Sequence, residues 1–294
     1  MKLVGILPAR NEDWILGFSV RSDLMWMDEL IVMNHSSTDR TAEILTKIQA
    51  EWGDHLTVIN QPNPAWMQYE YRQEMLGLAR ERGATHVAFL DADEVLTGNL
   101  LPTIRGLVGD LAPGQCLTLP VPCMWRSILR YRVGEFRYAH DKLTVAFADH
   151  PEVHWMVKDG YQHDQRQPYG LAGYVHAPVE GGVMHFQWAD WRRATAKHAL
   201  YQMNHMLRWP ERQTAQEIAE LHAGVIDETG LELAHAPAPW FKPYFPLLPY
   251  LKTGGVPWQE TECRRLWKLH GPEKFAGLNL FGVVEMETVV AVEA

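Results

Sequence analysis

Residues 86–96 read HVAFLDADEVL, and this stretch constrains the fold more than any other part of the chain. Its apolar first half predicts a buried strand, and Asp91, Asp93 and Glu94 follow where that strand would leave its sheet. Open α/β sheets bind ligands at the carboxyl ends of their strands. Three carboxylates in four positions repel one another unless a cation lies among them, and Mg²⁺ or Mn²⁺ prefers such oxygen ligands. The stretch therefore favours a metal site for a phosphorylated or nucleotide-linked substrate, and a solvated acidic turn is the alternative.

Composition narrows the class of protein. The length of 294 residues allows one large α/β domain with an extension, or two domains. The net charge of −9 argues against a broad nucleic-acid footprint. Its three cysteines, Cys116, Cys123 and Cys263, have no CxxC spacing, so we expect neither a disulfide framework nor a zinc site, and a cytoplasmic location. No apolar run reaches ~18 residues, so we expect no transmembrane segment.

Strand and helix patterns alternate along the first hundred residues. Strands are predicted at 3–8, 29–33, 56–59 and 86–90, and helices after Asn11, over 39–50 and over 67–82. Asn11 and Thr38 are the expected N-caps of the first two helices. A further helix is expected over 98–111, and further strands at 116–122 and 143–147. Such alternation predicts a mostly parallel sheet flanked by helices, with the loops after the strands along one edge.

The composition changes near residue 190. Residues 190–208 and 214–228 have helical patterns, and residues 236–258 are rich in proline and aromatic residues. We expect a domain over 1–190 and a helical or irregular extension over 191–294. The segment 236–258 is expected to be an arm packed on the domain, and a membrane-surface or subunit contact is the alternative.

Three motifs resemble those of family 2 glycosyltransferases, which have the Rossmann-like GT-A fold. They are LPARNE at 7–12, VMNHSSTDRT at 32–41 and FLDADE at 89–94, in the family's order, and the resemblance extends over roughly residues 2–195. Asn34 and His35 stand where the family often has two aspartates, and Arg40 replaces a usual glycine. These departures leave the identity of the donor nucleotide open.

The resemblance implies a role for each conspicuous polar group. The nucleotide pocket would be lined by Pro8, Ala9, Asn11, Glu12, Asn34, Asp39 and Arg72. For three of these residues a plainer interpretation exists: Asn11 and Asp39 as helix caps, and Arg72 as a surface arginine. Asp93 would bind the metal directly, and Asp91 would contact the ribose or bind the metal through water. Both aspartates are therefore candidate metal residues.

Two further residues belong to the expected site. His185, in HFQW, lies where many related enzymes have a third metal ligand, although a structural histidine is the alternative. An inverting transfer needs a carboxylate as general base, and Asp141 is the first choice because it precedes a predicted strand. Glu152, Asp159 and Asp164 are the other candidates.

The expected function is transfer of a sugar from a nucleotide-diphospho-sugar to a hydroxyl, with inversion and with Mn²⁺ or Mg²⁺. A UDP-sugar is the favoured donor, and the acceptor stays open between a glycan, a lipid-linked sugar, a small molecule, a protein and a modified DNA base. A nucleotidyltransferase is the enzymatic alternative, although LPARNE lacks a glycine-rich phosphate loop. A degenerate, non-catalytic domain is the other alternative, because of Asn34 and His35.

Overall fold

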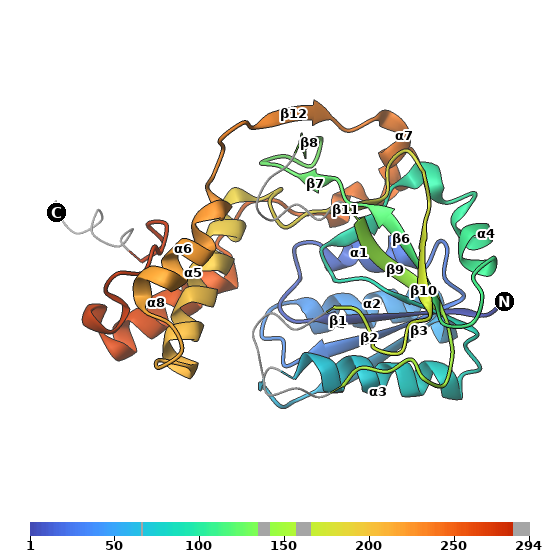
Figure 1. Cartoon of the computed structure of the whole chain (residues 1–294), viewed down its shortest axis with the longest axis horizontal. Helices are drawn as coiled ribbons and strands as arrows, with labels where there is room; N and C mark the ends of the chain where they lie inside the picture. Colours follow the sequence, from blue (N-terminus) through green and yellow to red (C-terminus); the bar gives the residue numbers. More distant parts are fainter. Residues whose placement is uncertain (66, 135–141, 157–165, 285–294) are drawn as a thin grey trace. The chain divides into compact units, whose positions relative to one another are not determined.

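The computed structural model describes residues 1–65, 67–134, 142–156 and 166–284 (Figure 1). The chain forms two compact units that interleave along the sequence. The first comprises Met1–Pro122, His140–His185 and Ala236–Lys252, and the second comprises Cys123–Ala139, Phe186–His235 and Thr253–Ala294. The domain boundary expected at residue 190 stays a prediction.

A seven-stranded sheet forms the first unit, in the order β10-β6-β9-β4-β1-β2-β3 (Figure 1). Its strands are β1 (Leu3–Ala9), β2 (Glu29–His35), β3 (Leu56–Gln61), β4 (His86–Phe89), β6 (Gln115–Pro120), β9 (Lys142–Ala148) and β10 (Gly173–His176). The four strands β4-β1-β2-β3 are parallel neighbours, whereas β9 runs antiparallel to both β4 and β6. This confirms the predicted mixed α/β fold with a mostly parallel sheet.

Helices cover both faces of this sheet because its strands are apolar on both sides. In β1, Leu3 and Leu7 belong to one core and Val4 and Ile6 to the other, as the two-residue period of a strand requires. The first core is completed by α1 (Leu16–Asp23), α2 (Thr41–Trp52) and α4 (Ile104–Gly109). The second core is completed by α3 (Gln68–Glu81).

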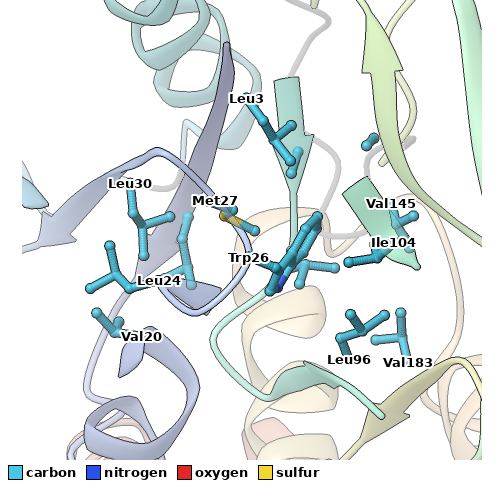
Figure 2. Packing of buried hydrophobic residues seen from close by; sticks show 14 of the residues in the cluster. Leu3, Val20, Leu24, Trp26, Met27, Leu30, Leu96, Ile104, Val145 and Val183 are labelled. Atoms are coloured by element: carbon cyan, nitrogen blue, oxygen red, sulfur yellow. The ribbon is translucent and has the colours of Figure 1, made fainter. Parts of the chain in front are cut away.

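The first core is packed around Trp26, which is 2 % exposed. Figure 2 shows its indole among the labelled side chains of this cluster, with Met27 beside it. Met27 also fills the space over Gly5, where an added Cβ would lie 2.2 Å from its sulfur atom. Replacing Gly5 would therefore displace a core side chain.

Two helices begin later than the sequence predicts. Asn11 does not cap α1, which begins at Leu16, and Thr38 does not cap α2, which begins at Thr41 after Arg40. The loops that precede them are held by contacts with one another, which are described below. The helix expected over 98–111 is also shorter, because a 3₁₀ turn at Gly98–Leu100 is followed by Pro102 before α4 begins.

The first unit contains a second pair of strands and an aromatic arm. β5 (Glu94–Leu96) pairs antiparallel with β11 (Val183–His185), with His185 opposite Glu94. The arm consists of α7 (Ala238–Phe241) and a 3₁₀ helix at Lys242–Tyr250. Tyr244 is fully buried in it and donates a hydrogen bond to the Leu96 carbonyl at 2.9 Å.

The second unit is mainly helical, as predicted for the C-terminal part. It contains β7 (Cys123–Met124), β8 (Arg130–Val133), α5 (Trp191–Arg208), α6 (Ala215–His222), a 3₁₀ turn at Ala223–Val225, β12 (Glu232–His235), α8 (Trp258–His270) and a 3₁₀ turn at Pro272–Phe275. The side chains of Asp190 and Thr214 accept hydrogen bonds from backbone N–H groups at the starts of α5 and α6. Among the described residues, no helix has both the length and the apolar character needed to cross a membrane.

Candidate active site

The polar clusters of the first unit meet at one edge of the sheet. Ala9 of β1 pairs with Asn34 of β2, and Asn34 pairs in turn with Asn60 of β3. β4 runs parallel to β1, so the acids that follow Phe89 leave the sheet at the same edge. The expectation that the loops after these strands converge is confirmed.

Asn11 ties the first loop to the second. Its backbone is left-handed, with φ 55°, a conformation that asparagine adopts more readily than most residues. Its side-chain oxygen accepts a hydrogen bond from the N–H of Thr38 at 2.7 Å, and its own N–H donates to the Ser37 hydroxyl at 3.0 Å. Asn11 therefore fixes the rim of the expected nucleotide pocket rather than a helix terminus.

Glu12 and Asp39 extend this connection. The Glu12 N–H donates to the Thr41 hydroxyl at 2.9 Å, and one Asp39 oxygen accepts from the Asp13 N–H at 3.1 Å. The other Asp39 oxygen accepts from the Thr41 N–H at 2.9 Å, at the start of α2. The geometry thus supports the capping interpretation of Asp39. Of the remaining pocket residues, Pro8 is half-buried and Ala9 buried at the end of β1.

Asn34 presents only an acceptor at this edge. It is 7 % exposed, and its amide nitrogen donates to Asn60 Oδ1 at 2.9 Å. Its own Oδ1 is buried and accepts no hydrogen bond from the residues the structure describes. Asn34 therefore has one buried acceptor without a hydrogen bond from the described residues, at the position where the family usually has an aspartate.

His35 is turned away from that acceptor. Its Nε2 lies 2.9 Å from the Asn63 carbonyl oxygen, and its ring lies 4.7 Å from the Tyr71 ring between centroids. Burial, followed by the positive charge of Arg10, lowers the pKa of His35 below its ordinary value. The second departure from the family motif is therefore a neutral ring that packs against the loop after β3.

Two guanidinium groups hold the first aspartate of the acid motif. Arg72 Nη2 lies 2.6 Å from Asp91 Oδ1, and Arg166 Nη1 lies 2.9 Å from Asp91 Oδ2. The Arg72 side chain is 2 % exposed, so the surface interpretation of this arginine is wrong. The Asp91 side chain is 37 % exposed, and an ionised carboxylate can accept about four hydrogen bonds in all.

Glu94 contacts both Arg166 and the backbone of the acid motif. Its two oxygens lie 2.7 and 2.6 Å from the Arg166 guanidinium, and one of them also accepts the Asp91 N–H at 2.9 Å. Burial raises the pKa of the Glu94 carboxyl, and the charge of Arg166 offsets part of that rise. Glu94 therefore orients Asp91.

Asp93 and His185 form a second pair beside this network. Asp93 Oδ1 lies 3.7 Å from His185 Nε2, and their side chains are 11 % and 15 % exposed. No group of three or more His, Cys, Asp or Glu side chains suited to a metal ion occurs within residues 1–65, 67–134, 142–156 and 166–284. Mg²⁺ and Mn²⁺ nevertheless bind through one or two protein ligands completed by water and substrate phosphates, so the Asp93–His185 pair fits such a cation.

Sequence reasoning missed Arg166 and Asn60. Arg166 lies 75 positions after Asp91, in a segment without a recognisable motif, and Asn60 lies 26 positions after Asn34, at the end of β3. The preferred general base, Asp141, lies outside the described residues, as do Asp159 and Asp164. Glu152 is described and is exposed.

Comparison with protein families agrees with the motifs. Residues 6–114 match the family described as glycosyl transferase family 2. Among solved structures, the chain is similar to S. aureus TarS 1–349 in complex with UDP-GlcNAc, with 12% identity, a TM-score of 0.45 and coverage of 96% of this chain and 87% of that one. GalNAc-T7 with UDP, GalNAc and Mn²⁺ is also similar, with 12% identity, a TM-score of 0.41 and coverage of 76% and 54%. A search of curated proteins found no match.

The matched segment contains all three motifs, from the end of β1 to the acids after β4. The resemblance inferred from LPARNE, VMNHSSTDRT and FLDADE is therefore confirmed. Over residues 6–114 this chain is thus similar to glycosyl transferase family 2.

Proposed function

We propose that the chain transfers a sugar from a UDP-sugar to an acceptor hydroxyl, with inversion, and that it depends on Mn²⁺ or Mg²⁺. The observation that carries the proposal is the arrangement of charges at the end of β4. Three carboxylates, Asp91, Asp93 and Glu94, face two guanidinium groups, those of Arg72 and Arg166. The carboxylates outnumber the guanidinium groups by one, and Asp93 Oδ1 lies 3.7 Å from His185 Nε2.

That arrangement suits a cation shared with a diphosphate. Asp93 and His185 would hold the ion, which when bound supplies positive charge to the departing nucleoside diphosphate. Asp91 would accept a hydrogen bond from a ribose hydroxyl, since both of its oxygens are already oriented by arginines. A carboxylate held in this way loses little side-chain entropy when it binds a ligand.

Asn34 supports the choice of uridine. Because its nitrogen is engaged with Asn60, its buried Oδ1 would accept from a base N–H, which the imide of uracil offers. Thymine carries the same imide, so its methyl group, and not Asn34, would have to exclude dTDP. The general base is proposed to be Asp141.

The test is calorimetric titration of UDP, GDP, dTDP and CDP, each with and without Mn²⁺. We expect UDP to bind when Mn²⁺ is present, and the Asp93→Asn and His185→Gln variants each to lose about 10-fold or more in Mn²⁺-dependent affinity. Asp110→Asn is the matched control, because Asp110 is an exposed acid of the same unit at the end of α4.

Two outcomes would refute the proposal. Failure of all four nucleotides to bind with Mn²⁺ present would remove the nucleotide-sugar donor and favour a non-catalytic domain. Binding that is unchanged in Asp93→Asn would separate the nucleotide site from the acid motif.

A further inference from the structure

The Arg166 side chain contacts several groups of the acid motif at once. Besides Asp91 and both oxygens of Glu94, its Nη2 donates to the Phe89 carbonyl at 2.7 Å, at the end of β4. Its guanidinium carbon also lies 5.5 Å from the centre of the Phe89 ring. One side chain thus contacts the strand end, the first aspartate and the glutamate.

The backbone of Arg166 is itself anchored. Its carbonyl accepts hydrogen bonds from Arg72 Nη1 at 2.8 Å and from Trp155 Nε1 at 3.0 Å. Because Arg72 also binds Asp91, the contacts form a closed ring: Arg72 to Asp91, Asp91 to Arg166, and the Arg166 carbonyl back to Arg72. A closed ring of charged groups with buried members restricts each member to one geometry.

Asp91 and Glu94 accept hydrogen bonds from the arginines of this ring, and Asp93 interacts electrostatically with Arg166. The two arginines form ion pairs with Asp91 and Glu94, and Asp93 Oδ1 lies 3.7 Å from His185 Nε2. If Arg166 were absent, Glu94 would be a buried carboxylate without its counter-ion, and Asp91 would lose the partner on one of its oxygens. Neither acid would then be held in the geometry that the ring gives it.

We propose that Arg166 is a positioning residue of the acid motif, which holds Asp91 and Glu94 in place so that Asp93 is the one carboxylate that receives the cation. The inference rests on the proposed function, because it assigns the cation to Asp93. It does not depend on the identity of the nucleotide. Arg166 acts only through the acids and is not itself a catalytic residue.

A lysine should not replace it. The Arg166 fork bridges two carboxylates and a carbonyl at once, whereas an ammonium group is a compact point charge without the planar fork. Arg166→Lys therefore keeps the charge and removes the geometry, while Arg166→Met removes both.

The experiment measures Mn²⁺ affinity by electron paramagnetic resonance, first with Mn²⁺ alone and then with UDP present. We expect Arg166→Met and Arg166→Lys to lose about 10- to 100-fold in Mn²⁺ affinity. Glu94→Gln combined with Arg166→Met removes the buried carboxylate as well, so it is the variant to use if Arg166→Met does not fold. It should regain thermal stability, but not the Mn²⁺ affinity of the wild type.

Arg80 provides the matched control. Like Arg166 it is an arginine of the first unit that bridges a carboxylate, Asp149, and the carbonyls of His150 and Val153. Arg80→Met should lower stability by a similar mechanism and leave Mn²⁺ affinity within about two-fold of the wild type.

The outcomes separate the inference from the proposed function. Wild-type Mn²⁺ binding that Arg166→Met or Arg166→Lys leaves within about two-fold overturns the role of Arg166 and leaves the function standing. An equal loss in Arg80→Met also overturns it, since the effect would then be general destabilisation. Mn²⁺ binding without UDP binding refutes the donor but still tests Arg166, and absence of wild-type Mn²⁺ binding overturns both.

Discussion

Asp23 should make the stability of the protein fall as pH rises, and Asp23→Asn should remove that dependence. The residue lies at the end of α1, is 0 % exposed, and neither of its oxygens has a well-formed hydrogen bond within the described residues. Burial raises the pKa of this carboxyl well above its ordinary value of 3.8, and the Trp26 indole offsets only part of the rise. The folded protein therefore keeps a proton here that the unfolded chain releases.

The sign and size follow from that difference in bound protons. Above pH 3.8 the unfolded chain loses the Asp23 proton, so the free energy of unfolding drops by about 1.4 kcal/mol per pH unit until the folded-state pKa is reached. The neutral amide of Asp23→Asn does not titrate. The free energy of unfolding of Asp23→Asn should therefore rise relative to that of the wild type as pH rises, by up to about 2.7 kcal/mol over two pH units.

Urea denaturation at several pH values, from about pH 5 to about pH 7, measures this gain. We compare the slopes of unfolding free energy against pH, because the cost of burying the amide of Asp23→Asn does not change with pH and so does not affect the slope. Asp110→Asn, at an exposed position, is the control and should follow the wild type. A difference between Asp23→Asn and wild type that stays constant or shrinks with rising pH would refute the reasoning.

Two further predictions concern the backbone. Gly77→Ala should raise the free energy of unfolding by about 0.5–1 kcal/mol, because Gly77 lies within α3 and an added Cβ would meet no atom within 4 Å. Gly170→Ala should lower it by about 2 kcal/mol or more, because φ is 76° and the Cβ would lie 1.8 Å from the Glu152 carbonyl oxygen. Chemical denaturation of both variants checks these signs, and a neutral Gly170→Ala would contradict the close contact. Thr214→Ala should cost about 1 kcal/mol by removing the capping box with Glu217 at the start of α6, and loss of helical circular dichroism in urea reports it. An unchanged midpoint would show that this box contributes nothing.

The sheet could be predicted from sequence because local patterns determine it. Each parallel strand is a short apolar run, and Gly83, with φ 78°, ends α3 where the pattern places the stop. Convergence of the loops at one edge followed from the parallel arrangement alone. The starts of α1 and α2 could not be predicted, because Asn11 and Thr38 bind each other across 27 positions and not their own helices.

The candidate site was predictable only in part, because some of its contacts join residues far apart in the sequence. Asp91, Asp93 and Glu94 are adjacent in sequence, so their chemistry can be recognised as a motif. Their charge balance depends on Arg166, whose segment has no periodicity or spacing that marks it as a counter-ion. The burial of Arg72 could not be predicted from the sequence either, since an arginine in a helix is usually solvated.

The ring around Arg166 also bears on the order in which the chain can complete its fold during synthesis. Glu94 leaves the ribosome 72 residues before its counter-ion, an interval of roughly 4 to 14 s at usual elongation rates. For the first part of that interval β9, which pairs with β4 and spans Lys142–Ala148, has not been made either. A nascent chain that ends near residue 114 therefore contains all three motifs. It lacks the charge of Arg166 and the strand β9, which pairs with β4. The segment that defines the family is in this sense not a folding unit, and the acid motif reaches its final geometry only after residue 166 has been made.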